Sequence, residues 1–172
     1  SSKFSENAMM MRASEIRELL KLTNKPGVIS FAGGLPDPAI FPVEEIREIA
    51  EDVILKKSVS ALQYSSTEGL PELREEISKK FHKGKFSPEN IFMSTGSQEG
   101  LDIVGKIFID PGDNIIVSAP TYLGAITAFK AYRPNFITIP MDNDGMRMDI
   151  LERELESIYS KGHTVKFLYT IP

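Results

Sequence analysis

The stretch Ile91-Phe92-Met93-Ser94-Thr95-Gly96-Ser97-Gln98-Glu99 decides the fold of this chain. Its apolar start predicts a short strand over residues 91–94, and the apolar periodicity that follows predicts a helix over 99–109. A turn of small residues between a strand and a helix presents free backbone N–H groups at the positive end of the helix dipole, where anions bind. Gly96 lets a ligand approach the backbone, and Ser97 adds a hydroxyl. The turn therefore predicts an anion site, although such turns also serve simply as helix caps.

The alternation of strand and helix continues to the end of the chain. Apolar runs rich in β-formers predict strands, and apolar stripes at helical spacing predict helices between them. The expected strands cover residues 114–118, 135–139 and 165–171, with helices ending near 131 and spanning 149–159. Before the turn we expect a helix over 13–22, an extended segment over 28–31, an irregular loop over 32–38, and helices opening at Pro42 and Pro71. This order is typical of an α/β sheet with helices on its faces.

Two loops leave strands at the same edge of this expected sheet. Residues 95–98 offer the anion site, and residues 119–122 carry an aromatic side chain, Tyr122. Ligands of open α/β sheets collect at the carboxyl ends of the strands. A phosphate site beside a planar ring is what a phosphorylated aromatic cofactor needs.

Composition narrows the class of protein. Hydrophobic residues make up 41% and charged residues 26% of the chain, which is typical of a packed intracellular domain. The net charge of −4 favours neither a nucleic-acid nor a membrane partner, and no apolar run approaches the ~20 residues of a membrane span. Without cysteine, a disulfide framework and a Cys-based metal site are excluded, and the two histidines lie in loop-like contexts that predict no metal site. A cytoplasmic location is expected.

Five segments of the chain stand out together, in this order: residues 12–20, 29–36, 62–69, 95–102 and 119–125. In sequence and order they resemble the N-terminal part of the fold-type-I, pyridoxal-phosphate-dependent aminotransferases of class I/II. The resemblance is greatest to the branch with the 2-aminoadipate, kynurenine and multi-substrate aminotransferases, and it covers nearly the whole chain.

The resemblance implies a fold and a domain division. The fold is α/β, a three-layer sandwich with a mixed, mostly parallel sheet that is incomplete in this chain. Residues 1–60 would hold the N-terminal helix, the substrate loop and a small-domain segment. Residues 61–172 would form the first part of the large cofactor-binding domain.

The resemblance also assigns cofactor residues. Gly96, Ser97 and Gln98 would hold the phosphate of pyridoxal 5'-phosphate, chiefly through backbone N–H groups, and Tyr122 would stack on its ring. Tyr64 would reach the phosphate of the neighbouring subunit, which implies a homodimer with shared active sites. One departure is Glu99, a glutamine in many relatives, whose charge would lie near the phosphate.

On the substrate side, Gly34 would line the site where a Cβ would block an amino acid, and Arg17 would meet a substrate carboxylate. The implied reaction moves an amino group between an L-amino acid and a 2-oxo acid, with 2-oxoglutarate as the expected acceptor. The family's Schiff-base lysine would lie beyond Pro172, so this chain carries no catalytic residue and is expected to be an inactive N-terminal fragment. The amino donor stays open.

Two other interpretations remain. The chain could belong to a transcription regulator with an aminotransferase-like ligand-binding domain, although no basic helix-turn-helix module is present and the charge is acidic. It could also be a non-catalytic fragment that binds a partner through the apolar strand 165–171, since unpaired strands invite association.

Overall fold

The computed structural model describes residues 3–10, 34–83 and 85–171. The chain separates into two compact units, one of Met10–Met93 and one of Ser1–Met9 with Ser94–Pro172. The division at residues 60 and 61 stays a prediction. The helix expected over 13–22 and the extended segment over 28–31 lie outside the described residues, as does the start of the irregular loop.

The unit of Met10–Met93 contains two α-helices in its described part. Helix α3, Val43–Leu62, follows Pro42 as expected, with Glu44 and Glu45 in the first turn where the dipole favours acids. It is kinked at Lys57, whose φ of −129° and ψ of 28° are not helical. Ser60 Oγ donates to the carbonyl of Lys57 at 3.1 Å, and a hydroxyl bonded to its own helix in this way competes with the backbone and bends it.

Helix α4, Pro71–His82, packs against the 3₁₀ turn Pro88–Asn90. Arg74 Nε donates to the carbonyl of Pro88 at 2.9 Å, and the buried Ser78 hydroxyl donates to the carbonyl of Phe86. These two partly buried bonds attach the segment after the helix to α4.

The second unit is built on a mixed sheet. The described strands are β1 (Asn114–Ala119), β2 (Asn135–Asp142), β3 (Gly145–Met146) and β4 (Val165–Tyr169), in the order β3-β2-β1-β4. Strand β1 runs parallel to both β2 and β4, and only β3 runs antiparallel, beside β2. The expected mixed, mostly parallel sheet is confirmed.

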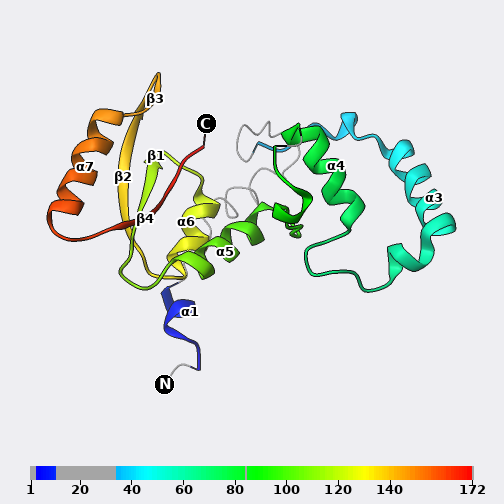
Figure 1. Ribbon diagram of the computed structural model, residues 1–172, viewed down its shortest axis with the longest axis horizontal. Helices are drawn as coiled ribbons and strands as arrows, with labels where there is room; N and C mark the ends of the chain where they lie inside the picture. The colour runs from blue at the N-terminus through cyan, green and yellow to red at the C-terminus, as the bar shows by residue number, and fades with distance from the viewer. Residues whose placement is uncertain (1–2, 11–33, 84, 172) are drawn as a thin grey trace, which may run out of the picture. The chain divides into compact units, whose positions relative to one another are not determined.

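Helices cover both faces of this sheet (Figure 1). Because neighbouring residues of a strand face opposite sides, Ile115 and Ile116 of β1 enter different cores. Ile115 packs with Ala125 and Phe129 on the side of α5 (Ser97–Phe108) and α6 (Leu123–Lys130). Ile116 packs with Ile139 and with Leu151 of α7 (Met148–Ser160). The three layers expected from the sequence are therefore present.

Three elements differ from the expectation. Residues 91–94 join no strand, and the N–H of Met93 donates instead to the carbonyl of Glu68 at 3.0 Å. Residues 145–146 form the short strand β3, which pairs with the end of β2 in a hairpin and was not expected. A short helix, α1 (Glu6–Met10), was also not expected, and its Glu6 pairs with Arg133 at 3.3 Å.

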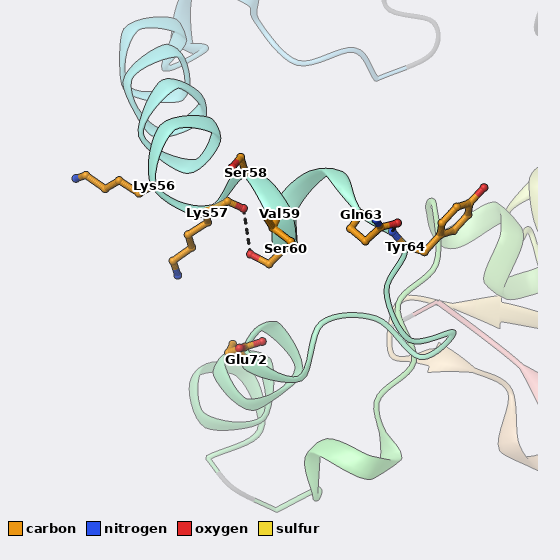
Figure 2. Close-up of a pocket in the computed structure, with 8 residues that line it drawn as sticks. All are labelled: Lys56, Lys57, Ser58, Val59, Ser60, Gln63, Tyr64 and Glu72. Atoms are coloured by element: carbon orange, nitrogen blue, oxygen red, sulfur yellow. Dashed lines mark hydrogen bonds between the residues drawn. The ribbon is translucent and has the colours of Figure 1, made fainter.

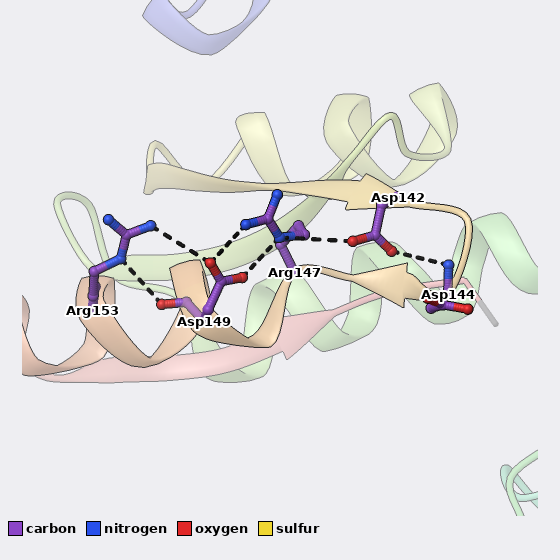
Figure 3. A network of polar contacts seen from close by, with 5 residues as sticks. All are labelled: Asp142, Asp144, Arg147, Asp149 and Arg153. Atoms are coloured by element: carbon purple, nitrogen blue, oxygen red, sulfur yellow. Dashed lines mark hydrogen bonds and ion pairs between the residues drawn. The ribbon is translucent and has the colours of Figure 1, made fainter.

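A group of charged side chains joins the β2–β3 hairpin to the start of α7 (Figure 3). Arg147 Nε and Nη2 donate to the two carboxylate oxygens of Asp149 at 2.8 and 2.7 Å. Asp142 lies 3.7 Å from the same guanidinium and also accepts from the N–H of Asp144. The hydrogen bond and charge of Arg147 lower the pKa of Asp149. The two hydrogen bonds link the residue that precedes α7 to the first turn of that helix.

Candidate functional site

The first turn of α5 has the geometry of an anion site. Gly96 caps the helix with φ of +158° and ψ of 168°, a conformation that L side chains rarely adopt. No atom lies within 4 Å of where its Cβ would be, so the backbone is open on that side. Within the described part of the chain, the N–H groups of Ser97 and Gln98 have no hydrogen-bond acceptor. These are the donors that a helix start offers to an anion.

A carboxylate of the chain itself already uses part of this turn. Glu99 Oε2 accepts from the N–H of Thr95 at 2.6 Å and from its hydroxyl at 2.8 Å. The backbone bond, and then the hydroxyl bond, lower the pKa of Glu99. The lowered pKa favours the charged form of Glu99, which lies in the same first turn of α5 as the free N–H groups of Ser97 and Gln98.

The second loop meets the first through one hydrogen bond. Gln98 Nε2 donates to the carbonyl of Gly124 at 2.9 Å and so joins the start of α5 to the start of α6. Tyr122 is the residue that precedes α6, and 47% of its surface is exposed. The structure thus brings together the two loops that the sequence placed at one edge of the sheet. Unpaired N–H groups and an accessible aromatic ring therefore lie on helix starts that one hydrogen bond joins.

Two buried hydroxyl groups near the carboxyl end of β1 have unused hydrogen-bonding capacity in the described part of the chain. Ser118 Oγ and Thr121 Oγ1 are buried and have no partner among the described residues. Unpaired buried hydroxyls are costly, and in a folded protein they usually find a partner.

The remaining site residues lie elsewhere in the chain. Tyr64, 99% exposed, lines an open hollow with residues of α3 and α4, among them Lys57 and Glu72 (Figure 2). Gly34 has a φ of +57° with open space around its Cβ position, so its backbone conformation alone favours glycine. Arg17 lies outside the described residues. The roles of these three residues stay predictions.

The described residues offer neither a metal-binding cluster nor a membrane-spanning helix. Over residues 3–10, 34–83 and 85–171, no three His, Cys, Asp or Glu side chains gather in a way that could hold a metal ion. Within the same ranges, no helix combines the length and the apolar character needed to cross a membrane.

Sequence reasoning missed two features of this site. It noted the charge of Glu99 but not its bonds to Thr95, and it gave no role to Gly124. The signal for Glu99 was its position as the third residue of the helix, from which a carboxylate can reach back to the N–H groups before the helix. The signal for Gly124 was a glycine inside a helix, two residues after the predicted stacking ring.

Known proteins resemble the chain over nearly all of its length. An aromatic-amino-acid aminotransferase of Thermococcus litoralis is 49% identical, over 98% of this chain and 41% of that protein. A 2-aminoadipate transaminase of Thermus thermophilus is 45% identical, over 100% of this chain and 41% of that protein. The crystal structure of a kynurenine aminotransferase of Pyrococcus horikoshii, in complex with PMP, superposes with a TM-score of 0.87 at 44% identity, over 99% of this chain and 43% of that one.

The chain thus spans 41% of the length of these two curated relatives. Residues 26–170 match the family model described as aminotransferase class I and II. Together with the mixed sheet and the joined helix starts, this match shows that the chain belongs to the aminotransferase class I and II family.

Proposed function

We propose that this chain is the N-terminal part of a cytoplasmic enzyme that transfers an amino group from an L-amino acid to a 2-oxo acid, with pyridoxal 5'-phosphate as cofactor. The acceptor is 2-oxoglutarate. The observation that carries the proposal is the hydrogen bond from Gln98 Nε2 to the Gly124 carbonyl, which holds an anion-binding helix start next to an exposed tyrosine. Relatives that share 45–49% of the sequence bear aminotransferase names, which supports the same reaction class.

The residues present fit a phosphorylated aromatic group. The open side of Gly96 and the free N–H groups of Ser97 and Gln98 accommodate a phosphate. Tyr122 offers a ring face that is half exposed. When bound, the cofactor supplies an electron-withdrawing ring that stabilises negative charge on the carbon that carries the amino group.

In this proposal the chain binds the cofactor and orients its ring, while the catalytic lysine lies outside residues 1–172. Ser97 and Gln98 donate to the phosphate through their N–H groups, and the dipole of α5 favours its charge. Tyr122 fixes the plane of the ring by stacking, which restricts the orientation of the reacting bond.

A proline at the first helical position tests the phosphate site in the whole protein. Ser97→Pro removes one N–H and the hydroxyl, but proline is favoured at this position and the preceding Gly96 lies outside the helical region that a following proline disfavours. Affinity for pyridoxal phosphate should fall about 10- to 150-fold, because a hydrogen bond to a charged group contributes about 1.5–3 kcal/mol. The thermal midpoint should hardly change.

The matched control is Met148→Pro, which places proline at the first position of α7, on the other face of the sheet. Equilibrium titration with pyridoxal phosphate, followed by absorbance, measures the cofactor affinity of both variants. Unchanged affinity in Ser97→Pro would move the phosphate away from this turn.

Sharing of active sites in a homodimer is part of the proposal. Tyr64 is 99% exposed in its own chain, which suits a role toward a neighbouring subunit. Mixing inactive Tyr64→Phe and Tyr122→Ala subunits should restore some transamination through hybrid sites. No recovery after subunit exchange would argue against shared sites.

Gly34 and Arg17 are proposed to face the substrate, and Arg17 is proposed to select dicarboxylic donors. A guanidinium pairs with a carboxylate through two parallel hydrogen bonds. Arg17→Ala should lower kcat/KM for glutamate or 2-aminoadipate about tenfold, and much less for leucine, because only acidic donors lose a charged hydrogen bond. Equal losses for both kinds of donor would make Arg17 a structural residue.

A further inference from the structure

Gly124 lies directly against two side chains of the candidate site. A Cβ built on it would be 2.4 Å from Cε1 and 2.5 Å from Cζ of Tyr122, and 2.6 Å from Oε1 of Gln98. Its carbonyl accepts the hydrogen bond from Gln98 Nε2 at 2.9 Å. The tyrosine ring and the glutamine amide therefore occupy the space that any larger residue at this position would fill.

These contacts are too short for a real side chain, because carbon atoms that are not bonded pack at about 3.5–4.0 Å. The atoms in the way are the far ends of side chains and not backbone. Tyr122 is 47% exposed, so its ring can turn aside with little loss of burial. Helix α6 itself tolerates alanine, which has a higher helix propensity than glycine.

Two other helical glycines differ from Gly124 in what surrounds their Cβ positions. Gly100, in α5, has no atom within 4 Å of its Cβ position, so no neighbouring side chain uses the space that a larger residue would fill. Gly105, also in α5, is buried against Tyr132 and Phe129 and belongs to the core. Of the three, Gly124 alone makes room for side chains of the candidate site.

We propose that Gly124 is a positioning residue, which seats the Tyr122 ring and anchors the Gln98 amide so that ring and phosphate of the cofactor are held together. This inference rests on the proposed function. Gly124 acts through Tyr122 and Gln98 and touches no reacting atom. Its missing side chain sets where the ring lies, and its carbonyl fixes the side chain that joins the two helix starts.

The test compares Gly124→Ala with the matched control Gly100→Ala in the whole protein. Gly124→Ala should weaken binding of pyridoxal phosphate about tenfold, as expected when a stacking contact and its orienting hydrogen bond are disturbed. Its thermal midpoint should stay at or above that of the parent. Gly100→Ala should keep the affinity of the parent.

A mutant cycle shows whether Gly124 acts through Tyr122 and Gln98. In a background that carries both Tyr122→Ala and Gln98→Ala, the collisions with the ring and with Gln98 Oε1 are gone, so adding Gly124→Ala should change affinity by less than twofold. If Gly124→Ala alone does not fold, the triple variant should fold, because neither side chain obstructs the new methyl group. A triple variant that fails to fold, while its Tyr122→Ala, Gln98→Ala parent folds, would make Gly124 a backbone requirement and overturn the proposal.

The outcomes separate this inference from the proposed function. If Gly124→Ala binds the cofactor like the parent, the positioning role is wrong and the proposed function stands. If Gly124→Ala weakens binding equally with and without the Tyr122 and Gln98 side chains, the role is wrong in its mechanism. If the parent itself binds no pyridoxal phosphate, the proposed function falls, and the inference falls with it.

Discussion

Glu99 shows how one side chain can serve the fold and oppose the ligand. Its carboxylate satisfies the N–H and hydroxyl of Thr95, which stabilises the entry into α5. The same negative charge lies in the first turn of that helix, where the proposed phosphate would bind. The two anions share one positive helix end, so the charge of Glu99 should reduce the affinity for phosphate.

Replacing Glu99 with Gln separates these two effects. The amide oxygen can still accept from Thr95, but the charge is gone. We expect pyridoxal phosphate to bind about two- to fivefold more tightly at low salt, and the gain to shrink at high salt, because exposed charges are screened. Titrations at two ionic strengths measure this, with the exposed Glu154→Gln in α7 as control. A gain that is independent of salt would rule out the electrostatic explanation.

At the scale of elements, periodicity predicted the helices and the parallel strands well. Helices α5 and α7 and strands β1, β2 and β4 lie within a few residues of their expected ranges. The apolar run at 91–94 was misassigned because a strand needs a neighbour, and alternation of residue types does not reveal one. Strand β3, of two residues, is too short to produce any periodicity.

Only those parts of the candidate site that belong to a local sequence motif could be predicted. Gly96, Ser97 and Tyr122 stand out as a helix start and a loop aromatic. The Gln98–Gly124 bond joins residues 26 positions apart, and such pairings depend on tertiary packing that a single sequence does not specify.

The packing of α5 on α6 depends on Gly105. A Cβ there would lie 2.7 and 2.8 Å from the ring of Tyr132 and 3.4 Å from Phe129, which is 1% exposed. Tyr132 also donates to Asp102 at 3.0 Å, and burial followed by this carboxylate raises the pKa of its hydroxyl.

We therefore expect Gly105→Ala to lower the free energy of unfolding by about 1–3 kcal/mol, because overpacking outweighs the gain in helix propensity. Gly100→Ala, with open space around it in the same helix, should be neutral or stabilising. Urea denaturation of both variants measures this difference in the free energy of unfolding. Equal stability of the two would show that the ring of Tyr132 moves aside freely.

At the scale of the whole molecule, three carboxylates make stability depend on pH. The pKa values of Glu99, Asp113 and Asp149 are lowered, mainly by hydrogen bonds from Thr95, Asp110 and Arg147 respectively. All three belong to the unit that contains the sheet. A carboxyl group whose pKa is lower in the folded state binds protons more readily when unfolded, so its stabilising contribution is present above the unfolded pKa.

The free energy of unfolding should thus be flat near neutral pH and fall as the pH drops below about 4, the ordinary carboxylate range, through the lower pKa values of the folded state. The loss per group should be small, since Glu99 and Asp149 are exposed to solvent and Asp113 is only partly buried. Urea melts at several pH values measure it, and Asp149→Asn should show a shallower loss on acidification. A stability that rose on acidification would contradict these pKa directions.

The kink in α3 has a consequence for how the chain is cut. A protease binds its substrate as an extended segment in its active-site cleft, and a regular helix does not offer an extended segment. At Lys57 the helical geometry is already broken, and the flanking Lys56 and Ser58 are exposed. Brief digestion with trypsin should therefore cut after Lys57 before it cuts after Lys79 or Lys106, which lie inside regular helices. A cut there would leave most of α3, Val43–Lys57, on one fragment and its last turn, Ser58–Leu62, on the other.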